Sequence, residues 1–104
     1  MDDPHYGYNH LEERIRSGVT LIGFESPGSP PCRDQKAIIE TLSRRFKNEA
    51  RIIELNIDDY RQLAIRLGIT SIPTLIIFKN GTEIRRFVGL QRDDILSREI
   101  QKVL

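Results

Sequence analysis

Cys32 is the only cysteine in this chain of 104 residues, and it closes the sequence Ser29-Pro30-Pro31-Cys32. Two cysteines at this spacing can exchange disulfides, because one thiolate attacks a substrate disulfide and the second thiol resolves the mixed disulfide. A serine hydroxyl performs neither step. The motif therefore has the spacing of a redox pair but lacks sulfur at position 29.

Ser29 and Cys32 have other predicted roles. The Ser29 hydroxyl keeps its proton and acts as a hydrogen-bonding group, and a serine in this position commonly caps a helix. A lone cysteine is more often a small buried hydrophobe than a reactive thiol. Arg33 and Lys36 would nevertheless favour the Cys32 thiolate if water reaches it. Both interpretations of Cys32 stay open at this point.

The histidines do not indicate a metal site. His5 and His10 lie near the start of the chain, far in sequence from Cys32. A site shared with Cys32 would require separated segments to converge. We therefore predict neither a metal nor a cofactor.

The composition is that of one ordinary globular domain. The chain is 38% hydrophobic and 30% charged, which is typical of globular proteins, and its length is too short for two domains. We expect a single domain over residues 1–104, with residues 1–8 as a poorly ordered start. A formal charge of +1 favours neither nucleic acid nor a membrane surface.

The cysteine count and the N-terminus predict a location. A single cysteine excludes a fold held together by intramolecular disulfides. The first residues have neither the positive charge nor the apolar run of a secretory signal, and no segment reaches the roughly 20 apolar residues of a membrane span. We predict a cytoplasmic monomer.

Helical and strand periods alternate along the chain. Such an order predicts an α/β protein with parallel strand pairing, and an Asn-Gly pair between two apolar runs predicts a hairpin. The predicted elements are a helix over about 9–17 ending before Gly18, a buried strand over 19–24, a long helix from about 31 to 47, a strand over 51–57, a helix capped by Asp58 or Asp59 and ending at Gly68, a strand over 74–78, a turn at Asn80-Gly81, a strand over 82–88, and a last helix with Leu96, Ile100, Val103 and Leu104 on one face.

Several segments together resemble the thioredoxin family. The resemblance covers about Val19 to Leu104 and implies a thioredoxin fold, which is a mixed central β-sheet flanked by helices. No first edge strand is found before Leu11, so we expect a shortened N-terminal part. The segments that carry the resemblance are Phe24 to Cys32, Leu55-Asn56-Ile57-Asp58, Ile72-Pro73-Thr74, Phe78-Lys79-Asn80-Gly81 and Val88-Gly89.

The resemblance also implies roles for individual residues. Ser29 falls on the attacking cysteine of the family and Cys32 on the resolving cysteine. Three departures weaken an ordinary assignment: Gly23 stands where many members carry a buried aspartate that assists proton transfer, Glu25 replaces an aromatic residue, and Gly28 replaces a tryptophan. The implied partners are disulfide-containing protein substrates and an upstream reductase.

A substrate-binding surface is implied as well. In the family the peptide bond before the residue that aligns with Pro73 is cis, and the backbone beside it pairs with an extended peptide, a form of strand addition. A proline that merely begins an internal strand is the alternative. The residues expected to bind substrate are Pro30, Pro31, Ser71, Ile72, Pro73, Gly89 and Leu90.

Three functions remain compatible with the sequence. The first is a protein thiol/disulfide oxidoreductase whose attacking cysteine is replaced by Ser29, as an engineered and inactive Cys-to-Ser form. The second is a natural redox-inactive module that binds a peptide or protein over Ser29, Ile72 and Gly89. The third is a glutathione-binding protein in which the Ser29 hydroxyl donates a hydrogen bond to the glutathione thiolate; the absence of a second, helical domain counts against it.

Overall fold

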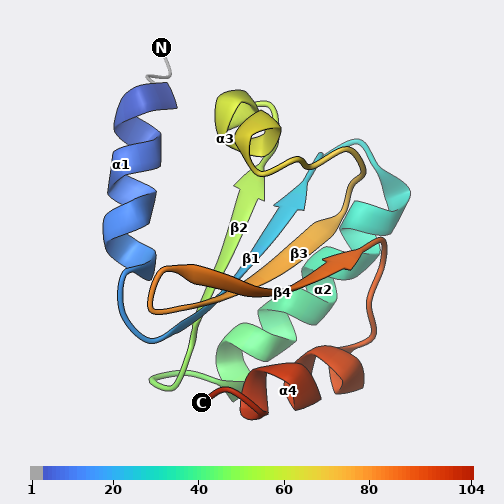
Figure 1. The fold of residues 1–104 in the computed structure, drawn as a ribbon. Helices are drawn as coiled ribbons and strands as arrows, with labels where there is room; N and C mark the ends of the chain where they lie inside the picture. The colour runs from blue at the N-terminus through green and yellow to red at the C-terminus, as the bar shows by residue number, and fades with distance from the viewer. Residues whose placement is uncertain (1–3) are drawn as a thin grey trace.

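The computed structural model describes residues 4–104, with side chains from residue 10 onward. Its helices and strands are packed as a sheet with helices on both faces (Figure 1). In chain order the elements are α1 (Pro4–Ile15), β1 (Val19–Glu25), α2 (Pro30–Arg45), β2 (Arg51–Asn56), α3 (Arg61–Arg66), β3 (Thr74–Lys79), β4 (Thr82–Val88) and α4 (Asp93–Gln101).

The sheet is mixed, as the sequence predicts. Its strand order is β2-β1-β3-β4. Strand β1 pairs in parallel with β2 and antiparallel with β3, and β3 pairs antiparallel with β4. Strand β1 follows α1 directly, so no edge strand precedes it within the described residues. The four-stranded sheet is consistent with the shortened N-terminal part.

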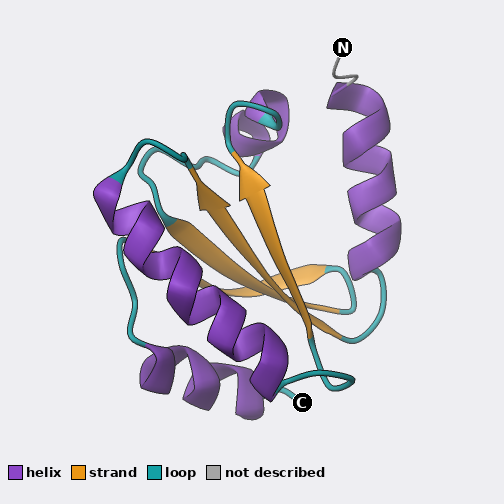
Figure 2. Cartoon of the chain, turned by 180° about the vertical axis from the view of Figure 1, so that it is seen from behind, coloured by secondary structure: helices purple, strands orange, loops and turns teal. Residues whose placement is uncertain are grey.

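Each face of the sheet has its own apolar core. Successive side chains of a strand point to opposite faces, so Leu21 of β1 packs with α2 and α4 while its neighbour Ile22 packs with α1 and α3. Helices α2 and α4 lie together on one side of the sheet (Figure 2). Both faces of β1 are therefore covered, which explains its continuous apolar sequence.

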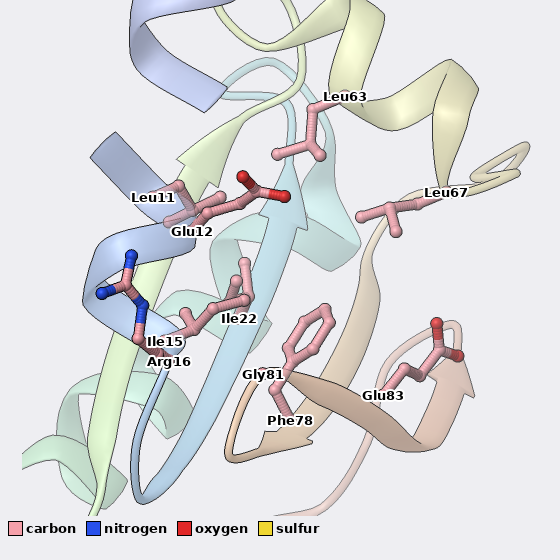
Figure 3. A pocket seen from close by; sticks show the side chains of 10 residues that line it. All are labelled: Leu11, Glu12, Ile15, Arg16, Ile22, Leu63, Leu67, Phe78, Gly81 and Glu83. Atoms are coloured by element: carbon pink, nitrogen blue, oxygen red, sulfur yellow. The ribbon is translucent and has the colours of Figure 1, made fainter. Parts of the chain in front are cut away.

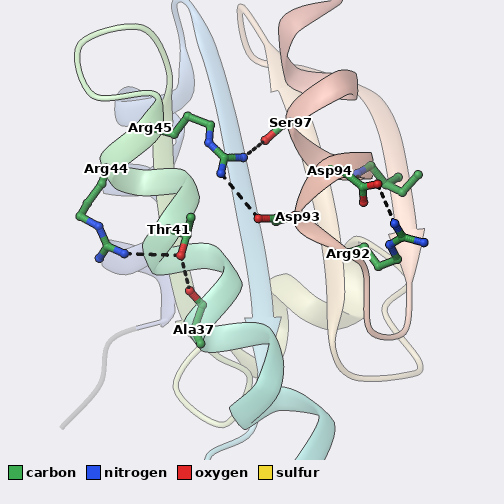
Figure 4. A network of polar contacts seen from close by, with 9 residues as sticks. Ala37, Thr41, Arg44, Arg45, Arg92, Asp93, Asp94 and Ser97 are labelled. Atoms are coloured by element: carbon green, nitrogen blue, oxygen red, sulfur yellow. Dashed lines mark hydrogen bonds and ion pairs between the residues drawn. The ribbon is translucent and has the colours of Figure 1, made fainter.

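Polar side chains at the rim join α2 to α4. Arg45 Nη1 donates to Ser97 Oγ at 2.5 Å, and Arg45 Nη2 lies 3.6 Å from Asp93 Oδ2 (Figure 4). Exposed ion pairs of this kind contribute at most about 1 kcal/mol. The burial of Leu96 and Ile100, both fully inaccessible to solvent, is what holds α4 against α2.

Three predictions about helix ends differ from the structure. Helix α1 begins at Pro4 rather than near residue 9, because proline is well suited to a first helical position. Residues 1–8 were expected to be poorly ordered, and residues 1–3 of them lie outside the described residues. Tyr60 precedes α3 in place of Asp58 or Asp59, and the Asp58 N–H bonds to Asn56 Oδ1 in the turn before the helix. Leu104 lies beyond α4 and is 48% exposed.

The predicted hairpin turn at Asn80-Gly81 is confirmed, and it is hydrogen-bonded to Gly18, the residue before β1. Asn80 and Gly81 have φ of 52° and 85°, the positive values that a two-residue turn of this type requires. The Asn80 side chain accepts a hydrogen bond from the Gly18 N–H at 2.8 Å, and the Asn80 N–H donates to the Gly18 carbonyl at 2.9 Å. The β3–β4 turn is thereby tied to the entrance of β1.

Replacing Asn80 tests this anchor. Asn80→Ala should lower the free energy of unfolding by about 1–2 kcal/mol, because alanine disfavours positive φ and the Gly18 amide loses its partner. Asn80→Gly is the control, since glycine accepts the φ value but cannot restore the side-chain bond. Urea denaturation should place the glycine variant between the wild type and the alanine variant; equal stability of all three would contradict the anchor.

Candidate functional site

The strand register brings the predicted site segments to one end of the sheet. Phe24 at the end of β1 pairs with Thr74 at the start of β3, and Thr74 pairs with Val88 at the end of β4. The loop after β1, the segment before β3 and the segment after β4 consequently leave the sheet at the same end, beside the start of α2 (Figure 1).

Ser29 lies at the start of α2, as predicted. It occupies the N-cap position with φ of −89° and ψ of 123°, but its side chain makes no capping hydrogen bond. An N-cap hydroxyl normally accepts from the second or third helical N–H. Pro31 in the second position has none, and no bond forms with the N–H of Cys32 in the third. The predicted capping bond is absent although the capping position is correct.

Cys32 is buried, a point that the sequence left open. Only 1% of its surface is exposed. The Ser26 N–H donates to Cys32 Sγ at 3.4 Å, within the range of bonds to sulfur. A buried sulfur that is already bonded to the backbone fits the interpretation of Cys32 as a small interior residue with restricted access.

Pro73 connects the other site segments. The Ile72–Pro73 peptide bond is cis. The Pro73 carbonyl accepts from the Gly89 N–H at 2.8 Å, and the Ser71 carbonyl accepts from Thr74 Oγ1 at 2.6 Å. These bonds place Gly89 directly beside Pro73.

The expected substrate-binding residues differ in exposure. Ser71 and Pro30 are exposed, Ile72 is half-buried, and Leu90 is 47% exposed. Pro31 is also exposed, while Pro73 is buried. Among the expected substrate-binding residues Pro73 is thus the buried one, while Pro30, Pro31, Ser71 and Leu90 are accessible.

Gln35 is a site-supporting residue that the sequence analysis missed. Although polar, it is only 1% exposed. Its Nε2 donates to the Gln91 carbonyl at 3.0 Å, and its Oε1 accepts from the Gln91 N–H at 2.7 Å. The pair of bonds fixes the segment after β4 to α2. The signal available in the sequence was the helical spacing of Gln35 from Ile39 and Leu42, which places it on the buried stripe of α2.

Gln35→Leu tests this support. Leucine is similar in size to glutamine and suits a buried position, but it leaves the N–H and the carbonyl of Gln91 without their partners. We therefore expect a loss of about 2–4 kcal/mol in unfolding free energy. The Gln91 amide should exchange its hydrogen faster. Gln62→Leu, at an exposed position on α3, is the matched control and should change stability by less than about 0.5 kcal/mol. Similar losses in both variants would refute the role of Gln35.

The space beside Gly23 is filled by Ile39. A Cβ atom at position 23 would lie 2.7 Å from Ile39 Cδ1, and Ile39 is 3% exposed within the core on the α2 side. The position that resembles the family's buried aspartate therefore holds apolar packing, with no room for an acidic side chain unless Ile39 moves.

A double-mutant cycle tests this packing. Gly23→Ala should cost about 1–3 kcal/mol through overpacking, and Ile39→Val, which removes the contacting methyl group, about 0.5–1.5 kcal/mol. Combined, the two changes should cost at least about 0.5 kcal/mol less than their sum, because the shortened residue 39 makes room for the new methyl group. Additive losses measured by urea denaturation would contradict the close contact.

A cleft of about 350 Å³ lies beside Cys32. Lys36 Nζ binds Glu54 Oε1 at 3.2 Å at its wall. Burial raises the pKa of Glu25, the nearby Glu54 carboxylate raises that pKa further, and Lys36 lowers it. From the sequence, Glu25 was noted only as a replaced aromatic residue and Glu54 was missed. The signal available was the charge of Glu54 between the apolar residues Ile53 and Leu55. The lining residues are Glu25, Ser26, Pro27, Cys32, Arg33, Lys36, Glu54 and Asn56.

A second, more apolar pocket lies on the other face of the sheet. Its volume is about 450 Å³, and it opens between α1, α3 and the β3–β4 hairpin (Figure 3). None of the predicted site residues lines it. Within the part of the chain that the structure describes, no group of three or more potential metal ligands is found, and no helix is long and apolar enough to cross a membrane.

The fold and the cis-proline site define a class, namely α/β proteins with a thioredoxin fold. The chain matches the thioredoxin family over residues 7–102 and belongs to that family. It is 32% identical over 96 residues to thioredoxin from Staphylococcus saprophyticus, with 92% of each chain covered.

Solved structures agree with this assignment. A mutant thioredoxin from Halobacterium salinarum is similar with a TM-score of 0.83 and 27% identity, covering 91% of this chain and 83% of that one. Fasciola hepatica thioredoxin, at 21% identity, shares the fold with a TM-score of 0.84 and coverage of 96% and 94%. The chain is thus a homologue of thiol/disulfide oxidoreductases that has a single cysteine.

Proposed function

We propose that this protein is the serine form of a protein-disulfide reductase, inactive in disulfide exchange as it stands because Ser29 occupies the position of the attacking thiol. The observation that supports the proposal best is the placement of Ser29 at the N-cap of α2, at the same sheet end as Pro73. A helix N-terminus stabilises an anion at that position. The local field would therefore lower the pKa of a thiol there, whereas an alcohol remains protonated.

Substrate contact in this proposal uses the segments around Pro73. An extended segment of a disulfide-containing protein pairs with the backbone at Ser71 and Ile72. The apolar side chains of the exposed Pro30 and Leu90 and of the half-buried Ile72 receive the neighbouring side chains of the substrate. The Gln35 bonds to Gln91 hold the segment containing Gly89 in place.

The partners follow from the same chemistry. A dithiol reductase must be reduced again after each turnover, so a form with both sulfurs needs an upstream reductase. We place the protein in the cytoplasm, where cysteines remain reduced.

The test is insulin-disulfide reduction with dithiothreitol as the electron source, comparing the wild-type chain with Ser29→Cys. We expect no turnover above background for the wild type and turnover well above background for the variant, because the introduced sulfur sits in the field of the helix terminus with Cys32 behind it.

Two controls make the comparison specific. Ser43→Cys adds a thiol at an exposed position of the same helix and should stay at background. Ser29→Cys combined with Cys32→Ser should form a mixed disulfide with insulin but not turn over, since no resolving thiol remains. A folded Ser29→Cys protein without activity would refute the reductase proposal.

A second candidate, a redox-inactive binding module, is favoured by one observation. Cys32 is buried and bonded to the Ser26 amide, so the sulfur that the chain retains is placed as an interior side chain. If Ser29→Cys is folded but inactive, binding of a partner over Ser29, Ile72 and Gly89 becomes the better explanation of the site.

A further inference from the structure

One carboxylate oxygen in the cleft beside Cys32 is buried without a partner. Glu54 Oε1 is bound by Lys36 Nζ, but Glu54 Oε2 is buried and has no hydrogen-bond partner among the described residues. A buried, unpaired acceptor is costly and requires an explanation. A donor that binds it in this cleft would supply one.

Glu25 is the neighbour that can supply this donor. Glu54 pairs with Gly23 across the β1–β2 register, so Glu25 lies two residues further along on the adjoining strand, within reach of a diagonal contact. Both side chains line the cleft that contains Cys32. Two ionised carboxylates are acceptors only, whereas one proton between them makes one of the groups a donor.

We propose that Glu25 and Glu54 hold one shared proton beside Cys32 and serve as the proton acceptor and donor for its thiol. This role rests on the proposed function, while the shared proton itself does not. Within the cleft lining no other carboxyl group is present. Position 23 offers no alternative, because Ile39 fills the space beside Gly23.

Charges of both signs surround the pair. From α2, Arg33 and Lys36 line the same cleft and Glu40 adds a more distant negative charge. From β1 and β2, the only charged cleft residues are Glu25 and Glu54 themselves. Burial and the charge of Glu54 raise the pKa of Glu25, whereas Lys36 opposes them.

The geometry at the sulfur suits transfer toward the cleft. Cys32 Sγ accepts the Ser26 N–H at 3.4 Å, so the backbone holds the sulfur at the wall of the cleft. The carboxyl groups of Glu25 and Glu54 line the same cleft, which places them on the side from which a proton can reach or leave the thiol.

The reaction step requires the sulfur introduced by Ser29→Cys. Once that sulfur forms a mixed disulfide with substrate, a carboxylate of the pair takes the Cys32 thiol proton. The Cys32 thiolate then attacks the introduced sulfur, and the bond to the substrate sulfur breaks with its electron pair on the substrate. The substrate thiolate takes up a proton. Two protein thiols are oxidised to a disulfide while one substrate disulfide is reduced.

The shared proton is tested first in the chain as it exists. Carbon-13 NMR of the glutamate carboxyl groups should show Glu25 titrating above its ordinary pKa of 4.5. Glu54→Gln should bring the Glu25 pKa down, since it removes the neighbouring charge. Glu40→Gln, at an exposed position on α2, is the matched control and should leave Glu25 nearly unchanged. Titration of Glu25 at its ordinary value in the wild type would overturn the proposal.

Stability gives a second readout with a defined sign. A carboxyl whose pKa is raised on folding binds its proton more tightly in the folded state, so its contribution to stability falls as pH rises from the ordinary pKa through the raised one. Glu25→Gln should therefore remove this fall, and the variant should gain on the wild type with increasing pH over that interval. Parallel stability curves for the two proteins would count against the raised pKa.

The catalytic role is tested in the Ser29→Cys protein. Glu25→Gln in that background should lower kcat for insulin reduction by at least about tenfold, leave KM unchanged and alter the pH profile of kcat. Glu40→Gln should match the Ser29→Cys parent. Unchanged kcat and pH profile in a folded Glu25→Gln protein would overturn the role of the pair. If Ser29→Cys itself has no activity, the reductase proposal and this catalytic role fail together, while the NMR titration still decides the shared proton.

Discussion

The register between β1 and its two neighbours is the constraint on which the site depends. Strand β1 is covered on both faces and paired on both edges, so its end at Glu25 is fixed. The pairing of Phe24 with Thr74 then determines where the chain must enter β3. A slip of one residue would turn every side chain of β1 to the opposite face. Both faces are apolar, so the alignment is favoured by the fit of individual residues, such as Ile39 in the space beside Gly23. Core packing thereby positions the loop of Ser29 relative to Pro73.

Helix α2 connects the core to the segments of the predicted site. Its buried stripe contains Cys32, Gln35, Ile39 and Leu42, and these residues face the sheet and α4. Apolar contacts near Ile39 and Leu42 hold the helix in place. The amide of Gln35 then fixes the segment after β4 through Gln91. A polar residue in an apolar stripe thus provides directional bonds where apolar packing alone would leave the loop free to shift.

Local patterns predicted most of the elements, and long-range contacts account for what was missed. The apolar runs of β1 and β3 and the Asn80-Gly81 turn depend on neighbouring residues, so the sequence reveals them directly. The Gln35–Gln91 bonds join residues 56 positions apart, and the Glu25–Glu54 proximity depends on the strand register. The start of α3 was missed for a different reason: neither aspartate takes the capping position, which Tyr60 occupies without a side-chain capping bond.

The departures from the family pattern are linked by the space around Cys32. An acidic side chain at position 23 would point into the core beside Ile39, where burial of charge is costly. Carboxyl groups instead stand at Glu25 and Glu54, where they line the cleft and Lys36 compensates part of the charge. Since Glu25 follows Phe24, its side chain leaves the strand on the face opposite to that of Phe24, and its position at the strand end keeps it outside the packed core. Strand β1 therefore retains apolar packing in its middle and has its one titratable group, Glu25, at the end that adjoins the cleft.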